Sequence, residues 1–212
     1  MENKKIFRKE NIPNILTVIR ALLVPVFMIA IIFSPRGAYG EKMQLGEIIM
    51  RLVSAAIFGL ISLTDMIDGK IARKYNYVSD FGKFLDPLAD KILVFGAMIS
   101  LITFMGGSEG LPYVFEICMV FAMFVFFTRE IAVTSLRLLF SNKGGHALAA
   151  NFAGKMKTVF QIVFILVSLI EPILWDIWVL TFATMLIMAA MTVISGIIYF
   201  KEYIPLIKGK VE

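Results

Sequence analysis

Six long apolar stretches are the feature of this sequence that most constrains its fold. They run near residues 13–33, 46–64, 88–105, 111–136, 158–170 and 177–199. About 20 mainly apolar residues in a helix cross the roughly 30 Å hydrocarbon core of a bilayer. The fifth stretch is the shortest and needs the turn upstream of it to reach that length. The sequence therefore predicts an all-α integral membrane protein with six transmembrane helices, in one domain covering residues 1–212.

The composition agrees with this fold class. Hydrophobic residues make up 59% of the chain and charged residues 17%, against about 45–50% and 25% in soluble domains. A single domain of this size has too little interior to hide so much apolar surface from water. Disorder, a coiled coil and a secreted disulfide scaffold are excluded on the same grounds.

Several kinds of chemistry are excluded by what the chain lacks. Its one cysteine, Cys118, excludes an intramolecular disulfide and a cysteine-based zinc site. Its one histidine, His146, excludes a histidine metal cluster and disfavours a Ser-His-Asp triad. No glycine-rich nucleotide loop of the dinucleotide or P-loop type occurs. Carboxylates, lysines and arginines must therefore carry the chemistry.

The distribution of basic residues predicts the orientation. Turn-forming residues separate apolar stretches at 34–37, 105–108, 142–145 and Glu171-Pro172. The loops opposite the N-terminal side hold only two basic residues, Arg36 and Lys42. The loops on the N-terminal side hold 15 of the 21: Lys4, Lys5, Arg8, Lys9, Lys70, Arg73, Lys74, Lys83, Arg137, Lys143, Lys155, Lys157, Lys201, Lys208 and Lys210. Positive residues favour the cytoplasmic side, so we expect both termini there.

Two consequences follow for the surface of the protein. The net charge of +5 would meet anionic lipid head groups rather than nucleic acid. The charged segment 1–11 is expected to form a short interfacial helix. A cleaved signal peptide does not fit, because the first apolar stretch is too long and contains Arg20.

Four basic residues fall within the apolar stretches or at their edges. Ionisable groups there are costly and mark a functional site or a paired partner. Arg51 lies near the outer interface, and we expect its side chain to snorkel toward water. Arg129 is followed directly by Glu130, and this pair is interpreted as functional. For Arg20 and Lys91 a structural and a functional role both stay open.

The densest group of charges lies between the second and third apolar stretches. Asp65 and Asp68 are three residues apart, and Asp86 and Asp90 are four apart, so each pair shares one helical face. Pro87 fits the first turn of the second of these helices, with Asp86 near its N-cap. A short cytoplasmic loop would bring the pairs face to face. A solvated loop explains Asp80 but not the two spaced pairs.

Four converging carboxylates would repel one another strongly without cations. Hard divalent cations relieve that repulsion, and ligation by oxygen alone selects Mg²⁺ or Mn²⁺ over zinc. Gly69 and Gly82 are positions where the backbone could come close to a ligand. The residues themselves therefore predict a metal site at the cytoplasmic ends of two helices.

At these positions the chain resembles the CDP-alcohol phosphotransferase family at every defined position of its motif: Asp65-x-x-Asp68-Gly69-x-x-Ala72-Arg73, eight residues, Gly82-x-x-x-Asp86-x-x-x-Asp90. Segments 11–20, 129–137 and 154–161 are similar to bacterial phosphatidylglycerophosphate synthases. The resemblance implies a six-helix, usually homodimeric protein of the bacterial cytoplasmic membrane. Such proteins transfer a phosphatidyl group from CDP-diacylglycerol to an alcohol and release CMP.

The resemblance also implies roles for particular residues. Two metal ions are expected on the aspartates of the motif, with Asp90 also the general base: Asp65, Asp68, Asp86 and Asp90. CDP-diacylglycerol binding is expected from residues near the motif and at the start of the first stretch: Pro13, Asn14, Thr17, Asp68, Gly69, Arg73, Ser79 and Gly82.

A second group of cations bears on the acceptor: Arg129, Arg137, Lys155 and Lys157. A phosphorylated acceptor needs such a group, and glycerol 3-phosphate fits it. Basic residues placed only for membrane topology would also explain part of the group. Other acceptors in the same family, phosphatidylglycerol or an inositol phosphate, stay open. A small ion-coupled transporter fits less well, because the four aspartates lie at the ends of only two stretches.

Overall fold

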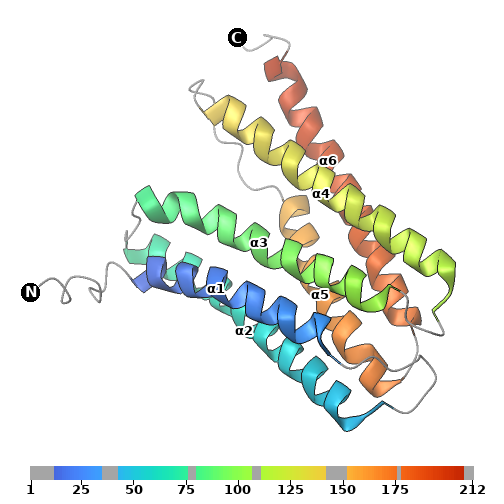
Figure 1. Cartoon of the computed structure of the whole chain (residues 1–212). Helices are drawn as coiled ribbons and strands as arrows, with labels where there is room; N and C mark the ends of the chain where they lie inside the picture. Colours follow the sequence, from blue (N-terminus) through green and yellow to red (C-terminus); the bar gives the residue numbers. More distant parts are fainter. Residues whose placement is uncertain are drawn as a thin grey trace, which may run out of the picture. The chain divides into compact units, whose positions relative to one another are not determined.

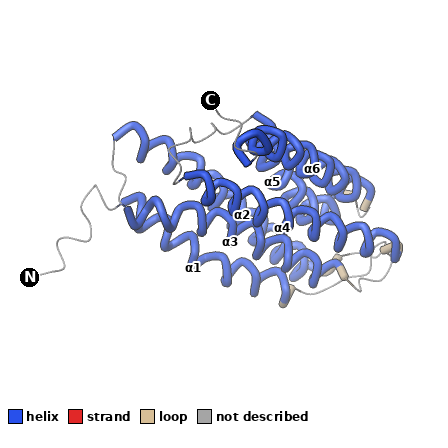
Figure 2. Tube along the Cα trace, turned by 90° about the horizontal axis from the view of Figure 1, so that it is seen from above, coloured by secondary structure: helices blue, strands red, loops and turns tan. Residues whose placement is uncertain are grey.

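The computed structural model describes residues 12–34, 43–75, 80–106, 111–141, 152–175 and 178–207. Some side chains within these ranges are outside the description, including those of residues 65–75, 80–88 and 90. The described residues are almost entirely helical (Figures 1 and 2). The six helices are α1 (Ile12–Ile32), α2 (Leu45–Tyr75), α3 (Asp80–Met105), α4 (Tyr113–Ser141), α5 (Phe152–Leu174) and α6 (Val179–Ile207). The predicted interfacial helix over 1–11 and His146 lie outside the described residues.

The helices confirm a multi-pass membrane protein of the all-α class. Four of them contain apolar segments long enough to cross a bilayer: Leu45–Thr64, Tyr113–Arg137, Phe152–Leu174 and Val179–Ile204. In α1 and α3 the apolar parts found among the described residues are shorter, Thr17–Ile32 and Lys91–Met105. The count of six spans therefore stays a prediction.

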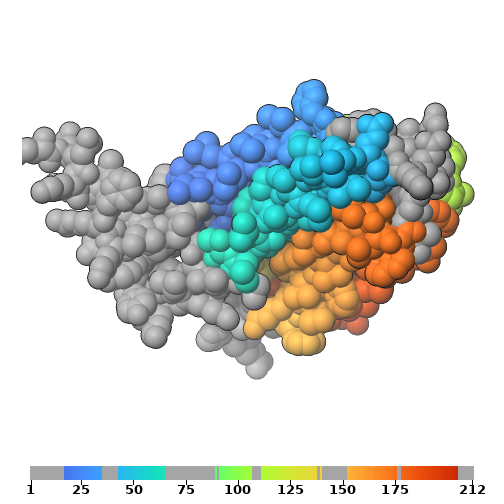
Figure 3. Space-filling model, turned by 90° about the horizontal axis from the view of Figure 1, so that it is seen from below, coloured from blue at the N-terminus to red at the C-terminus, as the bar shows by residue number. Residues whose placement is uncertain are grey.

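The chain divides into two compact units, and the first comprises residues 1–110 with 172–176. In this unit α1 packs against both α2 and α3, and α1 and α2 lie side by side on one of its faces (Figure 3). The Phe27 ring of α1 packs on the Phe58 ring of α2 with centroids 5.7 Å apart. Gly96 lets α3 approach α1 closely, because a Cβ there would lie 2.7 Å from Val24 Cγ1.

Arg51 of the first unit does not snorkel, so that prediction is wrong. Its side chain is buried, and its Nε and Nη2 donate to Glu47 Oε1 at 3.1 and 3.0 Å. Its guanidinium also lies 4.6 Å from the centroid of the Phe104 ring. A carboxylate one turn away and an aromatic face satisfy the charge inside the protein. Glu47 lies in the first turn of α2.

The second unit comprises residues 111–171 and 177–212. Here α4 packs against α6 around a buried cluster that contains Val133, Tyr199 and Tyr203. Gly154 of α5 lies beside Tyr199, since a Cβ built at the glycine would be 3.2 Å from the tyrosine hydroxyl. The cluster therefore joins α4 and α6, and the first turn of α5 lies beside it at the position of Tyr199.

The break expected at Glu171-Pro172 is a second correction. Both residues lie inside α5, which ends at Leu174, so the fifth span is longer than the stretch 158–170. Pro172 removes one backbone hydrogen bond close to the helix end, where little helix remains to disrupt. The buried Glu171 carboxylate accepts hydrogen bonds from the backbone N–H groups of Leu180 and Thr181 at 2.6 and 2.5 Å and from the Thr181 hydroxyl. It thereby satisfies donors that the start of α6 leaves without helical partners.

Candidate active site

The four motif aspartates fall on two consecutive helices, as predicted. Asp65 and Asp68 lie in the C-terminal part of α2, and Asp86 and Asp90 lie in the N-terminal half of α3. Only residues 76–79 separate the two helices. The spacings of three and four residues therefore place each pair on one face of its helix. The side chains of these aspartates lie outside the described residues.

The start of α3 differs from the prediction. The helix begins at Asp80, so Pro87 lies two turns inside it and Asp86 is not its N-cap. Asp80, interpreted as a loop residue, is the first residue of the helix. An acidic residue at that end is favoured by the helix dipole, which gives a physical reason for the earlier start.

The residues expected to bind the nucleotide lie at helix ends. Pro13 and Asn14 belong to the first turn of α1, and Thr17, one turn later, is buried. Arg73 lies in the last turn of α2. Gly69 and Gly82 are on α2 and α3, and Ser79 lies outside the described residues.

A buried charge cluster links α4 to α5 in the second unit. Arg129 Nη1 donates to Glu130 Oε1 at 2.8 Å, and the Lys157 ammonium donates to the same oxygen. Lys157 and Glu130 are both buried, so water screens these charges weakly. The interpretation of Arg129 and Glu130 as functional stays a prediction.

Tyr199 of α6 extends the cluster, and sequence reasoning did not select it. Arg137 donates to the Tyr199 hydroxyl. The guanidiniums of Arg129 and Arg137 lie 5.2 and 5.0 Å from the centroid of the Tyr199 ring. These two arginines therefore lie on one face of α4, as their separation of eight residues predicts. A tyrosine near the end of an apolar helix was the available signal, since a buried tyrosine hydroxyl needs a partner.

The cluster carries more positive than negative charge. Among the described residues, Arg129 and Lys157 bind the one carboxylate of the cluster, Glu130, and Arg137 joins the cluster through the Tyr199 hydroxyl. The buried Nε and Nη2 of Arg129 and Nε2 of Gln161 have no acceptor within the described part of the chain. Such an arrangement favours an anion with several oxygen atoms.

Lys155 is the one predicted acceptor residue that does not join the cluster. Its side chain is exposed on α5. It lies two residues from Lys157, and side chains at that spacing point away from each other on a helix. The structure therefore brings together three of the four predicted cations.

These features define an all-α membrane protein with an acidic motif across two helices and a cluster of cations around the buried Glu130 and Tyr199. The model of the CDP-alcohol phosphatidyltransferase family matches residues 10–196, and the chain belongs to this family. Members of the family generally use divalent metal ions. The match covers the aspartate motif and the three cations of the cluster, Arg129, Arg137 and Lys157.

Curated bacterial proteins are similar to most of the chain. One is the CDP-diacylglycerol–glycerol-3-phosphate 3-phosphatidyltransferase of Bacillus subtilis, 37% identical over 197 residues, which are 91% of this chain and 94% of that protein. A Mycobacterium tuberculosis protein named "Probable phosphatidylglycerophosphate synthase" is 34% identical over 192 residues, 91% and 81% of the two chains. A Pseudomonas fluorescens protein with the same name as that of B. subtilis is 28% identical over 201 residues, 93% and 92%.

Proposed function

We propose that this protein transfers the phosphatidyl group of CDP-diacylglycerol to sn-glycerol 3-phosphate, giving phosphatidylglycerophosphate and CMP. Family membership supports the phosphatidyl donor. The names of the similar bacterial proteins support the acceptor. The observation that carries the proposal is the cation cluster of the described residues, in which Arg129 and Lys157 bind Glu130 and Arg137 joins them through Tyr199.

The cluster suits a phosphorylated acceptor better than an uncharged one. Each bond between a guanidinium or ammonium and a phosphate oxygen is charge-assisted and therefore strong. The donors of Arg129 that lack an acceptor among the described residues are groups that a phosphate could satisfy. Glu130 holds Arg129 and Lys157 in place, and Tyr199 does the same for Arg137. We assign the acceptor phosphate to Arg129, Arg137 and Lys157, with Tyr199 as a positioning residue.

The aspartates have the donor set that a magnesium or manganese pair requires. Four carboxylates at helical spacing supply oxygen ligands alone, and we assign two metal ions to Asp65, Asp68, Asp86 and Asp90. When bound, such a pair neutralises the diphosphate and stabilises the attacking and leaving oxygens of an in-line displacement.

The protein's own groups would then move one proton and orient two substrates. Asp90 accepts the proton of the acceptor hydroxyl. The hydroxyl oxygen forms a bond to the phosphorus that carries diacylglycerol, and the bond from that phosphorus to the CMP oxygen breaks. Arg73 is assigned to the CDP phosphates because a guanidinium can donate two parallel hydrogen bonds to them. Gly69, Gly82, Ser79 and the α1 residues Pro13, Asn14 and Thr17 complete the nucleotide site in this proposal.

The acceptor is tested by supplying purified protein with CDP-diacylglycerol, Mg²⁺ and one alcohol at a time. Release of CMP with glycerol 3-phosphate, and not with inositol phosphate, serine or phosphatidylglycerol, supports the proposal. Release only with phosphatidylglycerol or inositol phosphate would keep the family and replace the acceptor. No release with any alcohol would contradict a transferase of this family and favour a transporter.

The cation cluster is tested by the separate KM values of the two substrates. Loss of one charge-assisted contact costs about 1.5–3 kcal/mol, so Arg137→Ala should raise the KM for glycerol 3-phosphate roughly 10- to 100-fold and leave that for CDP-diacylglycerol nearly unchanged. Tyr199→Phe keeps the ring and removes the hydroxyl, and a smaller rise is expected. Lys155→Ala is the matched comparison, because Lys155 is exposed outside the cluster. Equal effects of Arg137→Ala on both substrates would show that the cluster is not the acceptor site.

We also propose that the protein lies in the bacterial cytoplasmic membrane as a homodimer, with both termini and the aspartate motif on the cytoplasmic side. The uneven distribution of basic residues supports the orientation. The test uses a Cys118→Ser background and single cysteines introduced at residues 6, 40, 76 and 108. Positions 40 and 108 should react with an impermeant reagent in intact cells, whereas 6 and 76 should not. Labelling of position 76 from outside would refute the orientation.

A further inference from the structure

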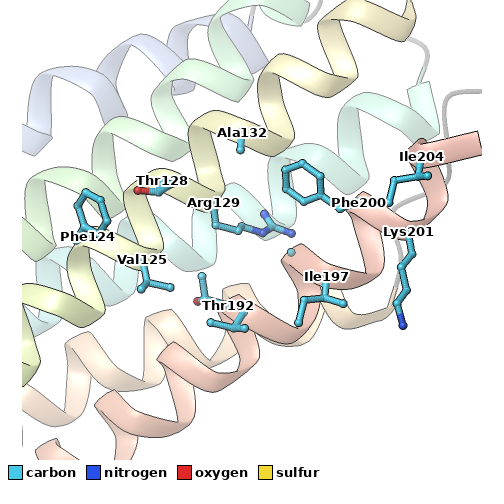
Figure 4. A pocket seen from close by; sticks show the side chains of 12 residues that line it. Phe124, Val125, Thr128, Arg129, Ala132, Thr192, Ile197, Phe200, Lys201 and Ile204 are labelled. Carbon is cyan, nitrogen blue, oxygen red and sulfur yellow. The ribbon is translucent and has the colours of Figure 1, made fainter. Parts of the chain in front are cut away.

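A pocket of about 520 Å³ lies in the second unit, lined by residues of α4 and α6 (Figure 4). Phe124 on α4 and Ile197 and Phe200 on α6 are among its apolar wall residues. These three side chains are 66%, 50% and 41% exposed, so the pocket opens onto the outside of the helices. None of its lining residues belongs to the aspartate motif.

The position of the pocket indicates what can enter it. Its walls fall within Tyr113–Arg137 and Val179–Ile204, two of the membrane-spanning segments. Lipid chains rather than water therefore surround its opening. Its volume lies in the range of about 300–1,000 Å³ typical of ligand pockets. An acyl chain is the occupant that matches the apolar walls and the surrounding solvent.

An apolar pocket alone would not select one lipid from another, because lipid chains are as apolar as its walls. The charges at the pocket supply the selectivity. Arg129 extends from α4 toward α6 (Figure 4), where its Cγ lies 3.3 Å from a Cβ built at Gly196. Lys201 lines the same pocket and is exposed, and its side chain leads away from the apolar walls (Figure 4).

The sign of the charge near the pocket is positive. Arg129 belongs to the cluster that holds three cations and, among the described residues, one carboxylate, Glu130. Glu202 follows Lys201 directly, but adjacent residues point to different sides of a helix. A lipid with a negatively charged head group is therefore favoured over a zwitterionic one.

We propose that this pocket binds one acyl chain of an anionic phospholipid, with the lipid phosphate at Lys201. The pocket would thereby hold an anionic membrane lipid on a surface made of α4 and α6. The proposal does not depend on which alcohol accepts the phosphatidyl group. It predicts a preference that a binding measurement detects without any enzymatic turnover.

The test places a fluorescent reporter in the pocket. Trp175→Phe and Trp178→Phe remove the two tryptophans of the chain, and Phe200→Trp puts one aromatic ring in place of another in the pocket wall. The protein is reconstituted in phosphatidylcholine nanodiscs with increasing fractions of brominated phosphatidylglycerol or brominated phosphatidylcholine, and bromine quenches tryptophan emission on contact. One lysine near a membrane surface contributes about a fivefold preference for anionic lipid. Half-maximal quenching of the Phe200→Trp reporter should therefore need roughly fivefold less of the brominated anionic lipid.

The matched reporter control is Phe152→Trp in the same background. Phe152 is 73% exposed on α5. It lies two residues from Gly154, whose built Cβ is 3.2 Å from the hydroxyl of Tyr199, the neighbour of Phe200. The two reporters are therefore at similar depth. Lys155 lies three residues from Phe152 and is exposed, so the control also carries Lys155→Gln, and Phe152→Trp should then be quenched equally by both brominated lipids.

The charge control uses three further variants on the Phe200→Trp background. Lys201→Gln should abolish the preference, whereas Lys201→Arg and Lys155→Gln should keep it. Equal quenching by the two lipids before any lysine is changed would overturn the proposal. Absence of quenching by either lipid would also overturn it, because protein, such as a second copy of the chain, would then cover the pocket.

Discussion

The connection between α5 and α6 provides a sharp test of how buried polar groups hold this fold. Glu171 is 1% exposed, and its two carboxylate oxygens accept three hydrogen bonds from the first turn of α6. Glu171→Gln keeps the shape of the side chain but removes the charge. It also replaces one acceptor oxygen with an NH₂ group, which then faces an N–H or O–H donor of Leu180 or Thr181.

The expected cost follows from these bonds. A hydrogen bond to a charged group contributes about 1.5–3 kcal/mol, and a buried donor left without an acceptor costs about 1–3 kcal/mol. The amide oxygen of Gln keeps one part of the network, so we expect a total loss of roughly 2–4 kcal/mol. The loss of a negative charge at a helix N-terminus acts in the same direction. For a chain of this length the midpoint of thermal unfolding should fall by roughly 5–15 °C.

The two tryptophans of the chain are suited to this assay. Trp175 directly follows α5, and Trp178 lies just before α6 with its ring 5.9 and 5.8 Å from those of Phe115 and Phe182. Opening of the connection should therefore shift their emission to longer wavelength. We expect this shift in detergent-solubilised Glu171→Gln at a lower temperature than in the unsubstituted protein, with the loss of helical circular dichroism following it.

Two threonine variants set the scale. Thr181→Val removes one of the three donors and should cost about 1 kcal/mol. Thr184→Val removes a hydroxyl that bonds only to carbonyls of its own helix, at 2.9 and 3.0 Å, and should have little effect. If Glu171→Gln is as stable as Thr184→Val, the carboxylate does not hold the connection and the reasoning fails.

Two further predictions concern the catalytic motif and the packing of the first unit. Asp90→Asn should lower single-turnover CMP release by about 10²–10⁴-fold, while calorimetry should still detect binding of CDP-diacylglycerol. Asp68→Asn should instead weaken the binding of metal and of nucleotide together. An equal loss of nucleotide binding in the two variants would show that Asp90 is a metal ligand and not the general base. Gly96→Ala should lower the free energy of unfolding by about 1–3 kcal/mol, because its Cβ would lie 2.7 Å from Val24 Cγ1, whereas Gly59→Ala meets no atom within 4 Å. Thermal unfolding of the two alanine variants checks this difference, and equal midpoints would refute it.

The helices were the most predictable part of this protein. An apolar stretch long enough to span a membrane is recognised from hydropathy averaged over many residues, and this average does not depend on particular tertiary contacts. The stretch 13–33 therefore closely matches α1 (Ile12–Ile32), and 177–199 falls largely within α6 (Val179–Ile207). The helix ends were less predictable. The helix α3 begins seven residues before Pro87, and α5 continues past Glu171-Pro172 to Leu174. A proline inside a helix removes one backbone hydrogen bond, but it does not by itself fix where the helix begins or ends.

Buried charges show why part of the site could not be predicted. The cost of a charge in the bilayer correctly marked Arg51 and Arg129 as residues in need of an explanation. Whether such a residue reaches water or finds a partner is decided by tertiary contacts. For Arg51 the partners are a carboxylate one turn away and the Phe104 ring, which is far away in sequence. The four-residue spacing of Glu47 and Arg51 was an available signal for the first of these partners, whereas no sequence pattern indicates the second.

The cation cluster combines both situations. The separation of eight residues predicted that Arg129 and Arg137 share a face of α4, and the chain order placed Glu130 beside the first of them. Tyr199 could not be chosen from among the aromatic residues of α6 by pattern, since its role depends on α4 meeting α6 at that level. Among the described residues, the Glu130 carboxylate fixes Arg129 and Lys157 in place, and the cluster holds more cations than carboxylates. A cluster with equal numbers of positive and negative side chains would hold the helices together equally well. The excess of cations therefore favours the binding of an anionic substrate over a purely structural role.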